Sequence, residues 1–189
     1  FVPFGALNVP VLPLSTAKLQ DFQSFVFGSD PGLVVLNETW LSSDHFDNEI
    51  LPDNAYTIFR RDRSAKTHPF DPNNPQKFRK KGGGVMIAVK SNLNFESKEV
   101  GRRVKAEILS VEMKCGNDIF CVTTCYRVGT LQHENFKEVE KHLRSIARIK
   151  KYKKHFFFGD LNLRNVSWPD GTTSVEIERR FVEFFDELG

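Results

Sequence analysis

The sequence is poor in the features that define several classes of protein. Only three of its 189 residues are cysteine, an odd number that does not fit the disulfide framework of a small secreted protein. No apolar run approaches the roughly 18 residues that a membrane span requires. The chain opens on Phe1, without the basic and then apolar layout of a signal peptide. We therefore expect a piece of a longer intracellular protein that does not enter a membrane.

The cysteines also show no pattern typical of a metal site. Cys121 and Cys125 are four residues apart in a strand-like segment, so they would share one face of the strand. No further pair of His or Cys stands nearby at zinc spacing. We expect Cys115, Cys121 and Cys125 to be buried free thiols in a reducing compartment.

The charge of the chain is modest but unevenly distributed. Charged residues make up 27% of the sequence and hydrophobic residues 40%, as in a globular domain, and the formal net charge is +3. Basic residues cluster at 77–81, 102–105 and 148–154. Such clusters can bind phosphates, but they can equally be solvated surface that keeps the protein soluble. Composition alone leaves both alternatives open.

Hydrophobic periodicity predicts an α+β (α/β) protein. Apolar residues at helical spacing predict helices at 15–28, 133–152 and 174–188. Short apolar or alternating runs predict strands at 33–36, 56–63, 82–90, 106–114, 118–127 and 155–158. A polar, proline-rich loop covers 64–81. Paired strands mixed with amphipathic helices indicate a two-sheet core covered by helices.

Polar side chains follow several of these strands at the point where each one ends. Asn8 follows an apolar start, Glu38 follows 33–36, Tyr126 closes 118–127, and Asp160 and Asn162 close the phenylalanine-rich strand. Strand ends that meet at one rim of a sheet bring together residues distant in sequence. Carboxylate and amide oxygens suit Mg²⁺, and a bound divalent cation lowers the pKa of water for phosphodiester hydrolysis.

Each of these residues also has a plainer interpretation. Glu38 alone could be a loop carboxylate or the start of a helix. Asp160 and Asn162 could form an Asx turn with Gly159. Tyr126 could be an ordinary strand aromatic, and Asn8 could belong to a turn. The residue types by themselves leave these alternatives open.

The order of the motifs resembles a known superfamily. The segments are "NETWL" (37–41), "FRRDR" (59–63) before "GGGVMIAVK" (82–90), "CYR" (125–127) and "GDLN" (159–162). Together they resemble the endonuclease/exonuclease/phosphatase superfamily, and within it the apurinic-type endonuclease domain of non-LTR (LINE-type) retrotransposons. The resemblance implies a four-layer α/β/β/α sandwich of two mixed sheets flanked by helices. It extends over nearly the whole chain.

The resemblance implies a metal-dependent DNA endonuclease. Glu38 would be the principal Mg²⁺ ligand, with Asn8 beside it, and Mn²⁺ could replace Mg²⁺. Tyr126 would hydrogen-bond the scissile phosphate, Asp160 would position or deprotonate the attacking water, and Asn162 would help to hold the phosphate. Alternatives are a phosphatase or phosphodiesterase of the same fold, and a nucleic-acid-binding remnant without catalysis.

Charge and position also suggest contacts with the DNA backbone. The candidates are six basic residues, namely Arg61, Arg63, Lys77, Arg79, Lys80 and Lys81. The resemblance further implies a monomer that is fused to a reverse transcriptase and acts in the nucleus.

The sequence departs from the superfamily pattern in three places. Val128 replaces a usual proline, and Leu161 replaces a usual phenylalanine. A later segment of the superfamily, with an aspartate and a Ser-Asp-His motif, does not occur before Gly189. "SSDHF" at 42–46 lies in the wrong part of the fold, so we expect His45 in a surface loop. We thus expect residues 1–189 to be a single domain, incomplete at the C-terminus, without the last strand or strands, and weak or inactive alone.

Overall fold

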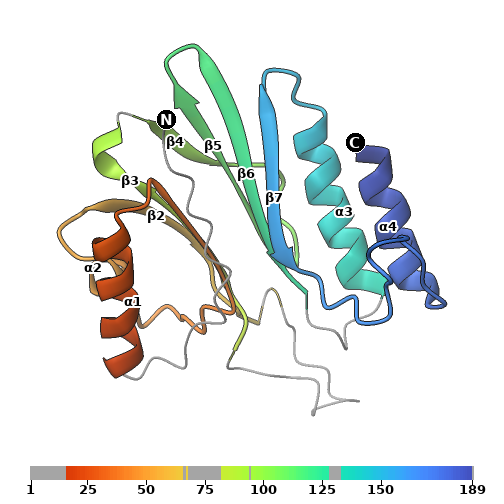
Figure 1. The fold of residues 1–189 in the computed structure, drawn as a ribbon, viewed down its shortest axis with the longest axis horizontal. Coiled ribbons are helices and arrows are strands. Elements are labelled where there is room, and N and C mark those ends of the chain that lie inside the picture. The colour runs from red at the N-terminus through yellow and green to blue at the C-terminus, as the bar shows by residue number, and fades with distance from the viewer. Residues whose placement is uncertain (1–15, 66, 68–81, 94, 128–132, 189) are drawn as a thin grey trace.

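Two β-sheets lie face to face between helices in the computed structural model of the chain (Figure 1). The structure describes residues 16–65, 67, 82–93, 95–127 and 133–188. Within these ranges no helix is both long and apolar enough to cross a membrane.

The first sheet is short, antiparallel and almost entirely buried. It consists of β1 (Leu33–Asn37), β2 (Tyr56–Arg61) and β3 (Val85–Lys90), in the order β1-β3-β2. β1 and β3 are continuous apolar runs because both of their faces are covered. Asn37 pairs with Val85, so the end of β1 lies beside the start of β3.

The second sheet combines an antiparallel hairpin with a parallel strand. It has the order β4-β5-β6-β7, with β4 (Glu96–Val100), β5 (Glu107–Cys115), β6 (Asp118–Tyr126) and β7 (Lys154–Asp160). β6 and β7 run parallel, and Tyr126 pairs with Asp160. Because a parallel pair needs a crossover, α3 (His133–Ala147) connects the two strands. The carboxyl ends of β6 and β7 therefore coincide.

Three layers of apolar side chains join the sheets and the helices. α1 (Thr16–Ser29) and the short α2 (Asp47–Ile50) lie on the outer side of the first sheet, where Phe22 and Val26 pack on Val34 and Met86. Between the sheets lies a second cluster that includes Val35, Ile87, Leu109 and Val122. α3 and α4 (Glu176–Leu188) cover the second sheet with Phe136, Leu143 and Phe181. The predicted α/β/β/α sandwich, in which helices flank the two sheets, is confirmed (Figure 1).

Some boundaries differ from the sequence prediction. The helix predicted over 133–152 ends at Ala147. Beyond it, Lys151 and the Tyr152 hydroxyl both bind Glu112, which draws the chain back to the second sheet. β4 and α2 were not predicted, because β4 is mostly polar and exposed and α2 is a single turn.

The cysteines and the phenylalanine-rich strand show a second set of differences. Cys121 and Cys125 are buried free thiols, as predicted, but Cys115 is exposed, because it ends β5 beside the hairpin turn. Phe156 and Phe158 face the cluster between the sheets, and Phe157 faces α4. All three are only half-buried, since β7 is the outermost of the described strands of its sheet.

Candidate active site

The ends of β1, β6 and β7 meet at one rim of the sandwich. Asn37, the last residue of β1, accepts a hydrogen bond at Oδ1 from Thr124 Oγ1 of β6, with the atoms 2.7 Å apart and both side chains buried. This bond ties the first sheet to the second at the residue that precedes Glu38. Since Tyr126 pairs with Asp160 across the second sheet, the three strand ends converge.

Glu38, Tyr126 and Asp160 form one electrostatic group. The Tyr126 pKa is raised, first by burial and then by the Glu38 carboxylate, with which its hydroxyl is hydrogen-bonded. The Asp160 carboxylate raises it further, while the Arg63 guanidinium lowers it. An acid from the first fifth of the chain and an acid near its end thus act on the same hydroxyl group. Tyr126 stays protonated and can donate a hydrogen bond to an anion.

The backbone after Glu38 is held by the triple-glycine segment. Thr39 N donates to Gly84 O at 3.2 Å, and Trp40 N donates to Gly83 O at 2.8 Å. Glu38 and Trp40 both adopt a φ of 54°, a left-handed conformation that is rare for such residues and clusters at functional sites. A Cβ on Gly84 would stand 2.5 Å from Thr39 Oγ1, so this close approach requires glycine.

A buried ion pair supports the same segment. Arg63 Nε and Nη2 donate to the two oxygens of Glu107 at 2.7 and 3.2 Å, and the side chains are 5% and 0% exposed. The guanidinium lies 5.8 Å from the centroid of the Tyr126 ring. A Cβ on Gly83 would overlap both partners, so the glycine makes room for the pair. Burial raises the pKa of Glu107, and its bonds with Arg63 and the Gly84 amide oppose that rise.

This geometry gives Arg63 a different place from the predicted DNA contact. Its guanidinium is shielded from solvent and is bound along its Nε/Nη2 edge by both oxygens of Glu107. In the sequence, Arg63 stands close to a basic loop. In the structure it is buried, because it binds the carboxylate of Glu107, 44 positions further along the chain. We therefore assign Arg63 to the support of the site.

The end of β7 is shaped by a short local turn. Asp160 Oδ1 accepts a hydrogen bond from the Asn162 amide at 2.9 Å, and Asn162 has a φ of 50°. The plainer interpretation of these two residues, an Asx turn, is thus present in the structure. The Asn162 side chain is in turn tied to the residue that follows β6, because its Nδ2 donates to Arg127 O at 2.6 Å.

Arg127 supports the end of β7, a role that the sequence analysis did not predict. Its amide donates to Asp160 O at 2.8 Å and its Nη1 to Leu161 O at 3.0 Å. The buried guanidinium lies 5.4 Å from the centroid of the Phe181 ring on α4. Burial lowers the Arg127 pKa, and the nearby Glu178 opposes this. The one available signal was its position in "CYR", directly after Tyr126.

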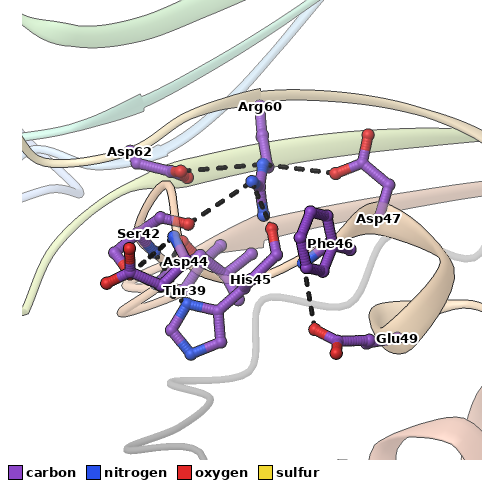
Figure 2. A network of polar contacts seen from close by, with 10 residues as sticks. Thr39, Ser42, Asp44, His45, Phe46, Asp47, Glu49, Arg60 and Asp62 are labelled. Atoms are coloured by element: carbon purple, nitrogen blue, oxygen red, sulfur yellow. Dashed lines mark hydrogen bonds and ion pairs between the residues drawn. The ribbon is translucent and has the colours of Figure 1, made fainter.

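The loop that follows Glu38 is fastened by Arg60, as Figure 2 shows. Arg60 Nη2 donates to His45 O at 2.6 Å and to Ser42 O at 3.4 Å, and its Nε lies within ion-pair distance of Asp47 and Asp62. Burial is the main cause that raises the Asp62 pKa. His45, predicted in a surface loop, lies in this fastened loop, where its Nδ1 contacts the Ser42 hydroxyl and amide.

Several predicted residues lie outside the described part of the chain. These are Asn8, Lys77, Arg79, Lys80 and Lys81. Arg61 is described, and its Nη2 forms an ion pair with Glu99 Oε1 at 3.0 Å between β2 and β4. The guanidinium therefore links the two sheets, and only part of it faces solvent.

The comparisons with known proteins give a likeness in fold. Neither family models nor curated proteins match the sequence. Among solved structures, the endonuclease domain of TRAS1, a telomere-specific non-LTR retrotransposon, superposes with a TM-score of 0.61 at 12% identity. The match covers 97% of this chain and 70% of that one. The chain has the endonuclease/exonuclease/phosphatase fold.

Two further structures with this fold have similar scores. The AP endonuclease LMAP from Leishmania major has a TM-score of 0.59 at 13% identity, with coverage of 97% of this chain and 64% of that one. An AP endonuclease from Archaeoglobus fulgidus has a TM-score of 0.58 at 16% identity, with coverage of 97% and 69%. The described endonuclease/exonuclease/phosphatase fold thus corresponds to roughly two thirds of each of these proteins.

The donor atoms at the rim of this endonuclease/exonuclease/phosphatase fold suit a hydrated hard cation. Within the described ranges, no three His, Cys, Asp or Glu side chains are placed to enclose a metal. Mg²⁺ keeps several waters and binds through one or two carboxylates, so it does not need such a cage. Glu38 and Asp160 supply carboxylates, and the Asn162 carbonyl supplies a further oxygen. These residues fit Mg²⁺ and do not fit a tetrahedral zinc site.

Proposed function

We propose that the chain is a divalent-metal-dependent DNA endonuclease domain of a retrotransposon-type protein, which nicks a phosphodiester bond at the rim of the two sheets. The observation that carries the proposal is the convergence of the ends of β1, β6 and β7 at one rim, where Asn37 binds Thr124 and Tyr126 pairs with Asp160. The likeness in fold to the TRAS1 endonuclease domain and to AP endonucleases supports DNA as the substrate and a reverse transcriptase as a fused partner.

Each residue at the rim has a chemical role in this proposal. Asp160 is fixed by the Asn162 amide and orients or deprotonates the attacking water. The Tyr126 hydroxyl, protonated because of its raised pKa, has one proton, which it donates to Glu38 in the unbound protein and to a phosphate oxygen once DNA is bound. Asn162 holds the phosphate from the other side of the turn.

Glu38 is the residue that would hold Mg²⁺ or Mn²⁺ in the proposed enzyme. The cation would neutralise phosphate charge and lower the pKa of bound water. Tyr126 orients the Glu38 carboxylate through their hydrogen bond, and the left-handed Glu38 backbone is kept in place by Gly83 and Gly84.

A plasmid-nicking assay tests the proposal. We expect the protein, as residues 1–189, to convert supercoiled plasmid to the open circular form only slowly with Mg²⁺ or Mn²⁺, and not at all with EDTA. Asp160→Ala and Glu38→Ala should each lower the rate by about 100-fold or more, as expected when an acid-base or charge-stabilising group is removed. Asp118→Ala, which removes a half-buried carboxylate in the β5–β6 hairpin, serves as the matched control.

Two results would contradict the proposal. One is a rate that is the same with metal and with EDTA. The other is nicking by Asp160→Ala at the rate of Asp118→Ala. Salt-sensitive binding of DNA without any nicking would favour the remnant that binds nucleic acid and catalyses nothing.

A second candidate is removal of a terminal phosphate from DNA. The structure of the 3' phosphatase NExo from Neisseria, bound to a product DNA hairpin, superposes with a TM-score of 0.57 at 16% identity. A 3'-phosphorylated oligonucleotide and an unmodified plasmid, assayed side by side, separate the two activities. Release of inorganic phosphate without nicking would favour the phosphatase.

A further inference from the structure

The connection between α3 and β7 contains the basic cluster at 148–154, which the proposed function does not use. Figure 1 shows this connection at the end of the second sheet opposite to the carboxyl ends of β6 and β7. β6 spans nine residues at about 3.4 Å each, so its first residue, Asp118, lies roughly 27 Å from Tyr126. The cluster at 148–154 is therefore far from the proposed site of cleavage.

The backbone of this connection is fixed to the second sheet. Lys153 N donates to Ile119 O at 2.7 Å. The Glu112 carboxylate, whose side chain is 8% exposed, accepts a hydrogen bond from the Tyr152 hydroxyl at 3.0 Å and forms an ion pair with Lys151 Nζ at 2.6 Å. These bonds hold the connection in one conformation, so the backbone positions of its basic residues are fixed.

Positive charge exceeds negative charge at this end of the sheet. Four lysines there pair with three acids, namely Lys98 and Lys151 with Glu112, Lys153 with Asp118, and Lys114 with Glu96. Arg148, Lys150 and Lys154 are exposed and form no ion pair with any acid of the described ranges. These seven cations form the basic end of the sandwich. Because they share three carboxylates, four positive charges are left unbalanced, more than the net +3 of the whole chain.

The basic cluster at 102–105 lies at the other end of the same sheet. It precedes β5, whose first residue, Glu107, pairs with Tyr126 beside the proposed active site. Its Arg103 forms an ion pair with Glu99. The second sheet thus presents a cationic surface at each end, and of these two surfaces only the one at 102–105 adjoins the rim.

We propose that the basic end binds the phosphate backbone of a second nucleic-acid segment while the rim holds the DNA that is cut. The proposal rests on the proposed function for the first of these two nucleic acids. Each Lys or Arg that neutralises a phosphate releases counterions, which favours binding without regard to sequence. Arg148, Lys150 and Lys154 are the main contacts, because binding to phosphate breaks no ion pair that they form with described residues.

Two other kinds of partner fit the basic end less well. A protein that reads an extended basic peptide needs a free main chain, whereas Lys153 N is bonded to Ile119 O and Lys154 begins β7. A membrane surface is bound through apolar side chains beside the cations. The large exposed apolar residues of the described chain lie on other segments, namely Phe25, Phe27, Trp40, Phe46 and Trp168. A nucleic acid needs only cations on a fixed surface.

Binding of short nucleic acids in EDTA tests this proposal independently of cleavage. The probes are a fluorescein-labelled DNA duplex and a fluorescein-labelled single-stranded RNA, measured by anisotropy between about 50 and 200 mM salt. The basic-end variant combines Arg148→Gln, Lys150→Gln and Lys154→Gln. It should bind one probe per chain about 10-fold or more weakly, and its slope of log affinity against log salt for the duplex should fall by roughly 2 to 3. The probe whose binding falls further identifies the nucleic acid.

A matched control removes the same net charge elsewhere. It combines three exposed cations of α3 and α4 that are already in ion pairs, as Lys141→Gln, Arg179→Gln and Arg180→Gln. Titration of concentrated protein should show one bound probe per chain fewer in the basic-end variant than in this control. Equal affinity and equal stoichiometry of the two variants would overturn the proposal, because binding would then follow net charge alone.

Two further measurements separate the remaining outcomes. Sedimentation with vesicles that contain phosphatidylserine tests a membrane partner, and vesicle binding lost in the basic-end variant while probe binding is kept would also overturn the proposal. Plasmid nicking with Mg²⁺ tests the endonuclease on the same samples. Loss of one probe per chain in a protein that never nicks would keep this inference and refute the endonuclease. Nicking by a protein whose probe binding does not depend on the basic end would do the reverse.

Discussion

The two acidic strand ends of the candidate site are held in place by different means. Glu38, after β1, depends on distant parts of the chain, since its loop binds Gly83 and Gly84 and rests on the Arg63–Glu107 pair. Asp160, at the end of β7, is shaped by the Asn162 amide two residues away and is completed by Arg127.

This difference shows how the site assembles. The Asp160 turn can form locally, because its hydrogen bond spans two residues. The Glu38 half needs both sheets, because Arg63 follows β2 of the first sheet and Glu107 lies on β5 of the second. The site is therefore complete only after the sheets pack on each other.

The largest effect is expected from Glu107. Glu107→Gln leaves the Arg63 guanidinium buried without its counter-charge and should lower the free energy of unfolding by about 3–5 kcal/mol. Glu99→Gln, which removes the partner of the more exposed Arg61, should cost at most about 1 kcal/mol. Urea denaturation measures both. Equal losses would show that burial of the first pair does not matter.

A smaller loss is expected at the Asp160 end. Arg127→Met keeps the apolar stem but removes the bond to Leu161 O, and should lower the free energy of unfolding by about 2 kcal/mol. Arg179→Met, on the exposed side of α4, is the control. Urea denaturation of both variants decides, and a loss no greater than that of the control would exclude Arg127 as a support.

Asp160→Asn should separate stability from activity. Its amide oxygen can still accept the bond from Asn162 N, so the free energy of unfolding should change by less than about 1 kcal/mol. Nicking should nevertheless be lost, because the negative charge is gone. Thermal unfolding and plasmid nicking measured on one sample test this. A variant that unfolds early would mean that the charge itself holds the turn.

The second sheet should also make the protein sensitive to acid. His142, on α3, accepts a hydrogen bond from Ser110, and burial lowers its pKa below the usual value, as it does for His155. The unfolded chain then binds more protons than the folded one at mildly acidic pH. Stability is therefore present above about pH 6.5 and lost as the pH falls below it.

Thermal midpoints between pH 5 and pH 8 measure this effect. His142→Gln should flatten the dependence on pH, while His45→Gln, in the loop after Glu38, should leave it unchanged. The groups that act on His142 electrostatically include Arg61, Glu99 and His155, so a slope that survives in His142→Gln would place the titration on His155 or elsewhere.

The sequence predicted the strand ends well, because each site residue follows an apolar run that has to be buried. It did not predict the supports. Glu107 is the first residue of β5, a strand that also contains Glu112 and Lys114, so nothing local distinguishes it or indicates its partner. The charge and position of Arg63 suggested a contact with DNA, but in the folded chain Arg63 forms a buried ion pair with Glu107.

By itself, the sequence determined most of the strands and helices, though not β4 or α2, and where polar groups interrupt them, since local periodicity and turn chemistry carry that information. The tertiary structure alone decided which charges meet, because bringing Arg63 onto Glu107, or Glu38 onto Tyr126, requires two sheets to close over residues far apart in the chain. Once these charged side chains are buried, the interactions between them are stronger than in water and hold the site residues in place.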